Sequence, residues 1–111
     1  MAEVDAQVYP SKAAFRACLN SSFRLHCAAG AVFPLELTEL QEGRSSPGWE
    51  AFALGFRAPP ETPPAQGTYR VEHEQLGAFD LFLVPIGRDG GGVYFQAVFN
   101  RVIDASNGDG E

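Results

Sequence analysis

The sequence predicts a mainly β protein: a small antiparallel barrel or a compact two-sheet sandwich of about six strands, with one short N-terminal helix. Apolar and polar residues alternate with a period of two over most of residues 21–103. The chain contains nine phenylalanines, a residue that favours strands and buries a large ring without polar atoms. No helical segment separates the predicted strands, so we expect antiparallel pairing. We favour the barrel, because closure removes exposed strand edges.

The chain is organised as one domain with short flanking segments. We expect residues 1–10 to form a flexible lead-in, residues 11–103 to form a single β domain, and the polar, acidic residues 104–111 to be disordered. Within the domain, the segment SKAAFRACLN predicts one short helix, with Ser11 as its N-cap and Asn20 at its end.

The first half of the domain predicts three strands, at residues 21–27, 31–42 and 49–58. The residues expected to face inward are Phe23, Leu25, Cys27, Phe33, Leu35, Leu37, Phe52, Leu54 and Phe56. Pro34 has no backbone N–H to donate, which predicts an edge position or a bulge in the second of these strands. Gly55 is expected to allow a close backbone approach or a bulge in the third.

The second half predicts three more strands, at residues 68–74, 78–86 and 92–103, after a proline-rich loop and separated by the turns QLG and RDGGG. In the first of these strands Tyr69 and His73 share one face with Val71. The second, AFDLFLVPI, is nearly all apolar, so we expect it to be covered on both faces. The third alternates again.

The charge of the chain argues against two classes of partner. The formal net charge is −6, whereas affinity for nucleic acid depends largely on basic residues that neutralise phosphates. The eight basic residues are scattered and form no basic amphipathic helix, so we expect no membrane partner. The first residues lack the basic and apolar regions of a cleavable signal peptide. We therefore expect a cytoplasmic protein.

The candidate catalytic residues gather around His73, which lies between Glu72 and Glu74. On a strand these two acids point to the face opposite His73, so they do not form a histidine–carboxylate pair with it. Cys18 and Cys27 are expected to be reduced, small buried residues. The sequence contains no metal-binding, phosphate-loop or serine-nucleophile motif. We predict no catalytic residue, no metal and no cofactor, and we expect that the chain is not an enzyme.

Four residues are candidates for binding contacts: Trp49, Tyr69, His73 and Tyr94. Trp49 follows a loop rich in glycine, serine and proline, and is either an exposed contact for a partner or a lid on the core at the end of a strand. If the four residues lined the mouth of a barrel, they would suit a small ligand or a carbohydrate.

The second half of the chain carries the signature QGTY–EH–LG–LFLVP–G–Y–AVFN between Gln66 and Asn100. With it the chain resembles an uncharacterised family of bacterial domains of unknown function, which is loosely associated with gene clusters for phage-tail-like proteins of the tail-collar type. The resemblance covers most of residues 11–103. Its signature consists mainly of turn glycines and core residues, so it describes a scaffold.

The resemblance implies a non-enzymatic, protein-binding β-domain that serves as an accessory or assembly component of a bacterial phage-tail-like or fibre-like structure. The implied partner is a protein such as a tail-collar-like fibre protein, with the oligomeric state unspecified. The implied location is the cytoplasm, or such an appendage reached without a cleavable signal peptide. The alternative is a small-ligand or carbohydrate-binding barrel.

Overall fold

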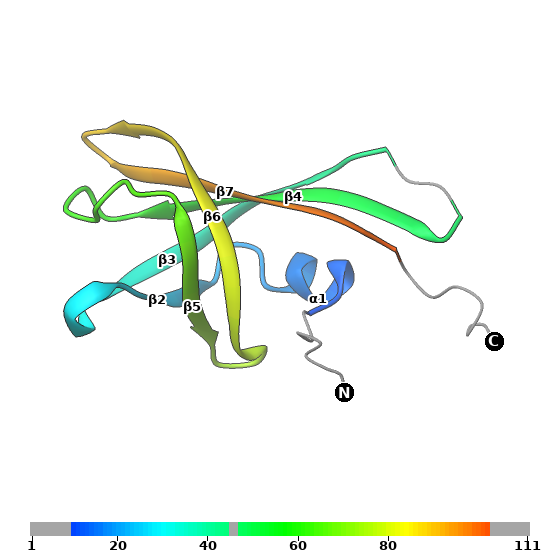
Figure 1. Ribbon diagram of the computed structural model, residues 1–111, viewed down its shortest axis with the longest axis horizontal. Helices are drawn as coiled ribbons and strands as arrows, with labels where there is room; N and C mark the ends of the chain where they lie inside the picture. The colour runs from blue at the N-terminus through cyan, green and yellow to red at the C-terminus, as the bar shows by residue number, and fades with distance from the viewer. Residues whose placement is uncertain (1–9, 45–46, 103–111) are drawn as a thin grey trace.

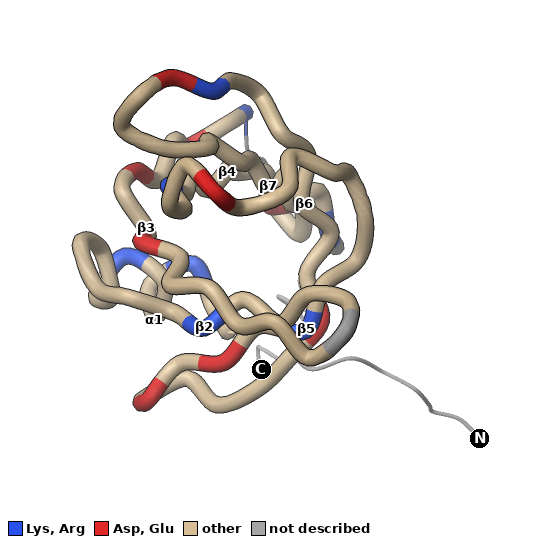
Figure 2. Tube along the Cα trace, turned by 90° about the vertical axis from the view of Figure 1, so that its left-hand side faces the viewer, with Lys and Arg blue, Asp and Glu red and all other residues tan. Residues whose placement is uncertain are grey.

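The computed structural model describes residues 10–44 and 47–102, and its strands form a closed antiparallel barrel in the order β2-β3-β4-β7-β6-β5 (Figure 1). The predicted fold class is confirmed, and the closed order decides for the barrel over the sandwich. The elements are α1 (Lys12–Ala17), β2 (Ser22–His26), the short 3₁₀ helix η1 (Ala28–Gly30), β3 (Val32–Glu42), β4 (Trp49–Ala58), β5 (Gly67–His73), β6 (Gly77–Asp89) and β7 (Gly92–Val102). The predicted tail, and the lead-in up to residue 9, lie outside the described residues. Figure 2 looks along the barrel and shows the strands forming a ring, with acidic and basic residues distributed around it.

Helix α1 is held in place by its cap and by its contacts with the barrel. As predicted, the Ser11 side chain accepts a hydrogen bond from the backbone N–H of Ala14, at 3.0 Å. Six residues are too few for a helix that is stable by itself in water. Lys12 and Arg16 both form ion pairs with Glu42 of β3. The helix is therefore stabilised by tertiary contacts. No described helix is long and apolar enough to cross a membrane.

Phe15 places α1 against the inner face of the barrel. Its ring is fully buried, with its centroid 6.3 Å from Phe52 of β4, 5.9 Å from Phe79 of β6 and 5.6 Å from Phe99 of β7. Phe52 and Phe99 stack on each other at 4.7 Å, and the guanidinium of Arg101 lies over both rings. Full burial of one such side chain stabilises a fold by about 1.5–3 kcal/mol.

The prediction that residues 78–86 are covered on both faces is wrong. In β6, Phe79, Leu81 and Leu83 are buried, whereas the side chains of Phe82 and Ile86 are 51% and 59% exposed. The wall of a barrel is one sheet thick, so residues of each strand alternate between the interior and the outside. An apolar run in such a strand therefore leaves large apolar side chains facing outward.

Cys27 and Phe33 are half-buried, which corrects the prediction that both are inward core residues. Strand β2 ends at His26, and Cys27 begins the turn formed by η1. On the β3 side this hairpin extends past its neighbour, because β4 pairs with β3 only from Glu36 onward. The side chains at the hairpin tip are therefore covered on fewer sides. Cys18, by contrast, is buried as expected.

Two irregular positions in β3 and β4 agree with the sequence. Pro34 lies beyond the end of the β3–β4 pairing, so its missing N–H removes no bond to β4. The register shifts between Leu37 and Glu39, with Gly55 on the opposite strand. The Thr38 hydroxyl donates a hydrogen bond to the Gly55 carbonyl at 3.1 Å, and this bond stabilises the bulge at the register shift.

The barrel closes through a short seam between β2 and β5. The seam comprises three residue pairs: Arg24↔Glu72, Leu25↔Val71 and His26↔Arg70. In contrast, β4 and β7 pair continuously from Trp49↔Val102 to Ala58↔Val93. Closure therefore depends on the side chains that flank the seam as well as on its few backbone pairs.

Replacing Gly92 with alanine is expected to destabilise the barrel by about 1–3 kcal/mol, the usual cost of overpacking. Gly92 has a φ of +155°, and a Cβ at this position would lie 2.4 Å from the carbonyl oxygen of Ala58. Gly90→Ala is the matched control in the same hairpin turn, because nothing lies within 4 Å of its added Cβ. Urea denaturation measures both free energies of unfolding. Equal free energies of unfolding for the two variants would contradict the close approach of β7 to β4 at Gly92 and Ala58.

Candidate functional site

His73 is a buried, hydrogen-bonded residue at the end of β5. Its side chain is 6% exposed, and its ring centroid lies 4.4 Å from that of Phe23. Its Nδ1 accepts a hydrogen bond from the backbone N–H of Gln75 at 3.0 Å, and its Nε2 lies 2.9 Å from the hydroxyl of Ser21. Both ring nitrogens thus form hydrogen bonds within the protein.

The hydrogen bonds of His73 define which nitrogen carries the proton. A backbone N–H can only donate, so Nδ1 accepts and Nε2 carries the hydrogen. Nε2 then donates to Ser21, whose hydroxyl donates in turn to the carbonyl of Cys18. A histidine that activates a serine nucleophile must accept the serine proton, which is the reverse direction. This contact therefore suits structure and does not suit proton abstraction.

The structure separates the four residues expected to line a barrel mouth. Tyr69 and His73 lie on the inward side of β5, whereas Trp49 begins β4 and is 40% exposed on the outer face. Trp49 pairs with Val102 at one end of β7, and Tyr94 lies near the other end. Tyr94 and Val102 are eight positions apart on β7, which in an extended strand corresponds to about 26 Å. The four residues therefore do not surround one opening.

Tyr69 is half-buried near the proline-rich loop. Its hydroxyl donates to the carbonyl of Ala65, and its ring packs edge-on against Phe95 at 6.3 Å. Burial raises the pKa of Tyr69, and the nearby Cys27 adds to the shift. The hydroxyl is thus kept in its protonated, donating form, and it ties the loop to β5.

Polar side chains from four strands form a row across the outer face of the barrel. The backbone pairs Ser22↔Glu36, Glu36↔Arg57 and Arg57↔Tyr94 place these four residues side by side on β2, β3, β4 and β7, and we call them the polar row. Side chains of directly paired residues lie on the same face, about 5 Å apart. An Arg57 Nη donates to a carboxylate oxygen of Glu36 at 2.7 Å.

Tyr94 continues the polar row into the hairpin between β6 and β7. Its hydroxyl lies 3.2 Å from each carboxylate oxygen of Asp89. Burial raises the pKa of Tyr94, and the bond to Asp89 adds to the increase, while Arg57 opposes it. The sequence identified Tyr94 as a candidate but missed Ser22, Glu36 and Arg57, because only the register between distant strands brings them beside it.

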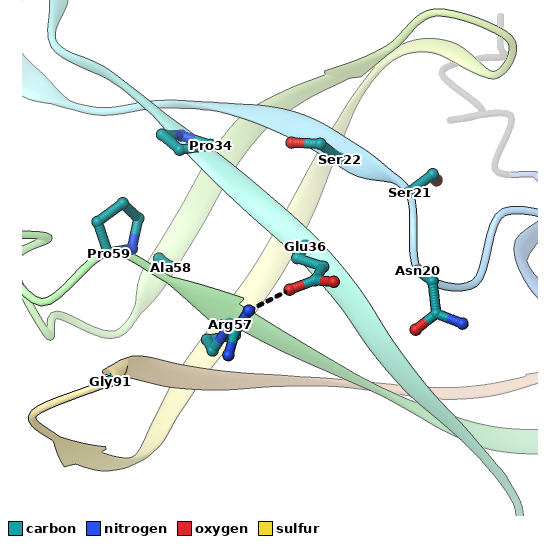
Figure 3. A pocket seen from close by; sticks show the side chains of 9 residues that line it. All are labelled: Asn20, Ser21, Ser22, Pro34, Glu36, Arg57, Ala58, Pro59 and Gly91. Atoms are coloured by element: carbon teal, nitrogen blue, oxygen red, sulfur yellow. Dashed lines mark hydrogen bonds and ion pairs between the residues drawn. The ribbon is translucent and has the colours of Figure 1, made fainter.

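Ser22, Glu36 and Arg57 of the polar row line a groove of about 420 Å³ (Figure 3). The residues of its lining that matter most to its chemistry are Ser22, Pro34, Glu36, Arg57, Pro59 and Gly91. Pro34 and Pro59 lie beyond the last β3–β4 pair, Glu36↔Arg57, and Figure 3 shows the Glu36 and Arg57 side chains pointing toward each other.

Apolar side chains dominate a different part of the outer surface. Phe82 and Val98, 51% and 61% exposed, line one depression of about 200 Å³ between β6 and β7. Val98 also borders a second depression, of about 260 Å³, whose floor includes Ala51 and Ala53 of β4. Trp49 lies two residues further along the same face of β4. We call Trp49, Ala51, Ala53, Phe82 and Val98 the apolar face. Alternation in the last strand placed Val98 on the face opposite Phe99, whereas the apolar character of residues 78–86 hid the outward position of Phe82.

A cluster of charges lies on the outside of the β2–β5 seam. A carboxylate oxygen of Glu72 accepts hydrogen bonds from Nε2 of His26 at 2.8 Å and from Nε of Arg24 at 3.2 Å. These bonds, that of His26 first, lower the pKa of Glu72. Beside them Arg70 pairs with Asp80 at 3.3 Å. These ion pairs cross between strands, from β2 to β5 and from β5 to β6. Among the described residues, no group of three or more histidines, cysteines and acids could hold a metal ion.

Ser21→Ala is expected to lower the free energy of unfolding by about 1–3 kcal/mol, because it leaves the buried Nε2–H of His73 without its acceptor. Ser22→Ala is the matched control next to it. Its exposed side chain makes only a long contact, 3.5 Å, to the carbonyl of Phe23, so we expect a change within about 0.5 kcal/mol. Urea denaturation of both variants tests this, and an equal loss would refute the role of the buried bond.

Glu72→Gln is expected to flatten the decline of stability in acid. The pKa of Glu72 is lower in the folded chain, so its contribution is complete above about pH 4.3, the ordinary glutamate value, and is lost as the pH falls through the folded value. Glu74→Gln, at an exposed position just after β5, is the control. Free energies of unfolding measured from about pH 7 downward test this. The same acid decline in wild type and Glu72→Gln would contradict it.

The family model of a domain of unknown function (DUF6916) matches residues 10–99 of the chain. A search of curated proteins and a search of solved structures give no match. The matched residues include α1, six strands up to Phe99, His73, the polar row and the apolar face. This agrees with the resemblance to an uncharacterised domain family that the sequence suggested. The chain belongs to the DUF6916 family of domains of unknown function.

Proposed function

We propose that the chain is a non-enzymatic protein-binding domain, and that it serves as an accessory or assembly component of a bacterial phage-tail-like or fibre-like structure. The observation that carries protein binding is the apolar face. Single exposed apolar residues are ordinary, but neighbouring ones that share a face are typical of interaction sites. Here Phe82 and Val98 line the same depression, and Val98 pairs directly with Ala53.

The shape of the apolar face suits the side chains of another protein. Ala51 and Ala53 are small, and both line the depression that Val98 also borders. Apolar side chains of a partner can fill this depression, while Phe82 lines the neighbouring depression and Trp49 lies exposed at the start of β4. Buried aromatic residues of this kind contribute most of the binding energy in many interfaces.

Two further observations support the proposal. The hydrogen bonds of His73 leave it unsuited to proton abstraction, which favours binding over catalysis. The resemblance to bacterial domains associated with tail-collar-type proteins favours a role in assembly. The alternative of ligand binding at a barrel mouth has less support, because Trp49 and Tyr94 lie at opposite ends of the β4–β7 pair.

Binding to a bacterial tail-collar-like protein, the partner proposed here, is expected to fall at least tenfold in the double variant Phe82→Ser, Val98→Ser. The reason is the loss of both large apolar side chains from the apolar face. Val32→Ser is the matched control, because Val32 is also exposed, at 48%, but lies at the start of β3. Surface plasmon resonance measures the affinities, and thermal melting checks that each variant is folded.

The outcomes separate the two parts of this proposal. If the double variant and Val32→Ser bind as wild type does, the apolar face is not the contact surface. If the tail-collar-like protein does not bind at all and pull-down from the native cell recovers only proteins unrelated to such appendages, the assembly role is wrong.

A further inference from the structure

We propose that the groove along the polar row binds a short, neutral saccharide. This inference does not rest on the proposed function, because the groove and the apolar face occupy opposite ends of β4. The groove adjoins Arg57 to Pro59, and the apolar face begins at Trp49. A volume of about 420 Å³ lies within the range of small-ligand sites, roughly 300–1,000 Å³.

Hydrogen-bonding groups of opposite kind follow one another along the polar row. A carboxylate acceptor of Glu36 lies next to the guanidinium donors of Arg57, and the hydroxyl of Ser22 precedes them. On the far side of Arg57 come the hydroxyl of Tyr94 and the carboxylate of Asp89. Each sugar hydroxyl both donates and accepts, so it can bridge an acceptor and a donor that lie about 5 Å apart.

The ion pair between Glu36 and Arg57 leaves both groups with unused hydrogen-bonding positions for a ligand. A guanidinium has five N–H donors and a carboxylate has about four acceptor positions, whereas this pair uses one contact of 2.7 Å. Both side chains are partly exposed, at 35% and 49%, and such pairs stabilise a fold by at most about 1 kcal/mol. The fold therefore does not require these two side chains.

The balance of charge favours a neutral ligand over an anion. The positive charge of Arg57 is matched by Glu36, and Asp89 adds a second negative charge beyond Tyr94. A phosphate or carboxylate would meet these two carboxylates as well as the guanidinium.

The walls of the groove also match a sugar ring. Pro34 and Pro59 provide rigid apolar surfaces on one side of the groove (Figure 3). Gly91 also lines the groove, and a Cβ added to it would be 3.6 Å from the hydroxyl of Tyr94, so this hydroxyl lies close to the margin of the groove. The C–H faces of a pyranose pack on such flat apolar groups while its hydroxyls reach the polar row.

Titration of the ¹⁵N-labelled chain with maltose, cellobiose, lactose and diacetylchitobiose tests the proposal. We expect at least one disaccharide to cause saturable amide shifts at Ser22, Glu36, Arg57 and Tyr94. Glu36→Ala and Tyr94→Ala are expected to weaken that binding at least tenfold, the effect of losing a hydrogen bond to a charged group or a packed ring. Thr68→Ala, on the exposed side of β5, is expected to bind as wild type does.

Three results would overturn the proposal: no saturable shift with any of the four sugars, shifts confined to the apolar face, or tighter binding of inorganic phosphate than of every sugar. Glu36→Gln and Tyr94→Phe keep the shape of each side chain and serve as second variants if an alanine variant does not fold. The amide shifts report only on the polar row. A negative sugar titration therefore does not affect the proposed protein-binding role, and a failure of protein binding at the apolar face does not affect the saccharide proposal.

Discussion

The structure depends on closure of the barrel at the seam between β2 and β5. Only three residue pairs join these strands, so the seam is the shortest link in a ring that encloses the whole core. The buried hydrogen bond from His73 to Ser21 stabilises the seam at one end. On the outside, the hydrogen bonds that Glu72 accepts from Arg24 and His26 stabilise it further. Without closure, the aromatic interior would face water, and the edges of both strands would be open to other chains.

A second constraint is that the barrel wall is one sheet thick. The interior is filled by side chains such as Phe23, Phe56 and Phe95, all at most 1% exposed, which is typical of a small barrel. A ligand or partner therefore meets the outer surface. The two surfaces with distinct chemistry lie at opposite ends of β4, with charges and hydroxyls beside Arg57 and apolar side chains near Trp49. Each can act without disturbing the core.

Much of the fold was predictable because alternation is a local property. The segment WEAFALGFRA has the same bounds as β4, and Ser11 caps α1 as expected. The apolar run AFDLFLVPI was misinterpreted, since nothing in it reveals that its outer face has no second layer of structure. The candidate site was predictable only residue by residue. Trp49 and Tyr94 were identified singly, and the sequence grouped them with Tyr69 and His73, which the barrel places elsewhere.

The sequence by itself determined the secondary structure, the inward and outward side of most strand positions, and the absence of a catalytic motif, because each follows from residue types at short spacing. Only the tertiary structure decided which strands are neighbours, and in what register. It joined Ser22, Glu36, Arg57 and Tyr94 into one row although they come from four strands. It also gave His73 its two hydrogen-bond partners. The physical reason is that pairing register depends on bulges and on closure of the whole ring, which no local pattern contains.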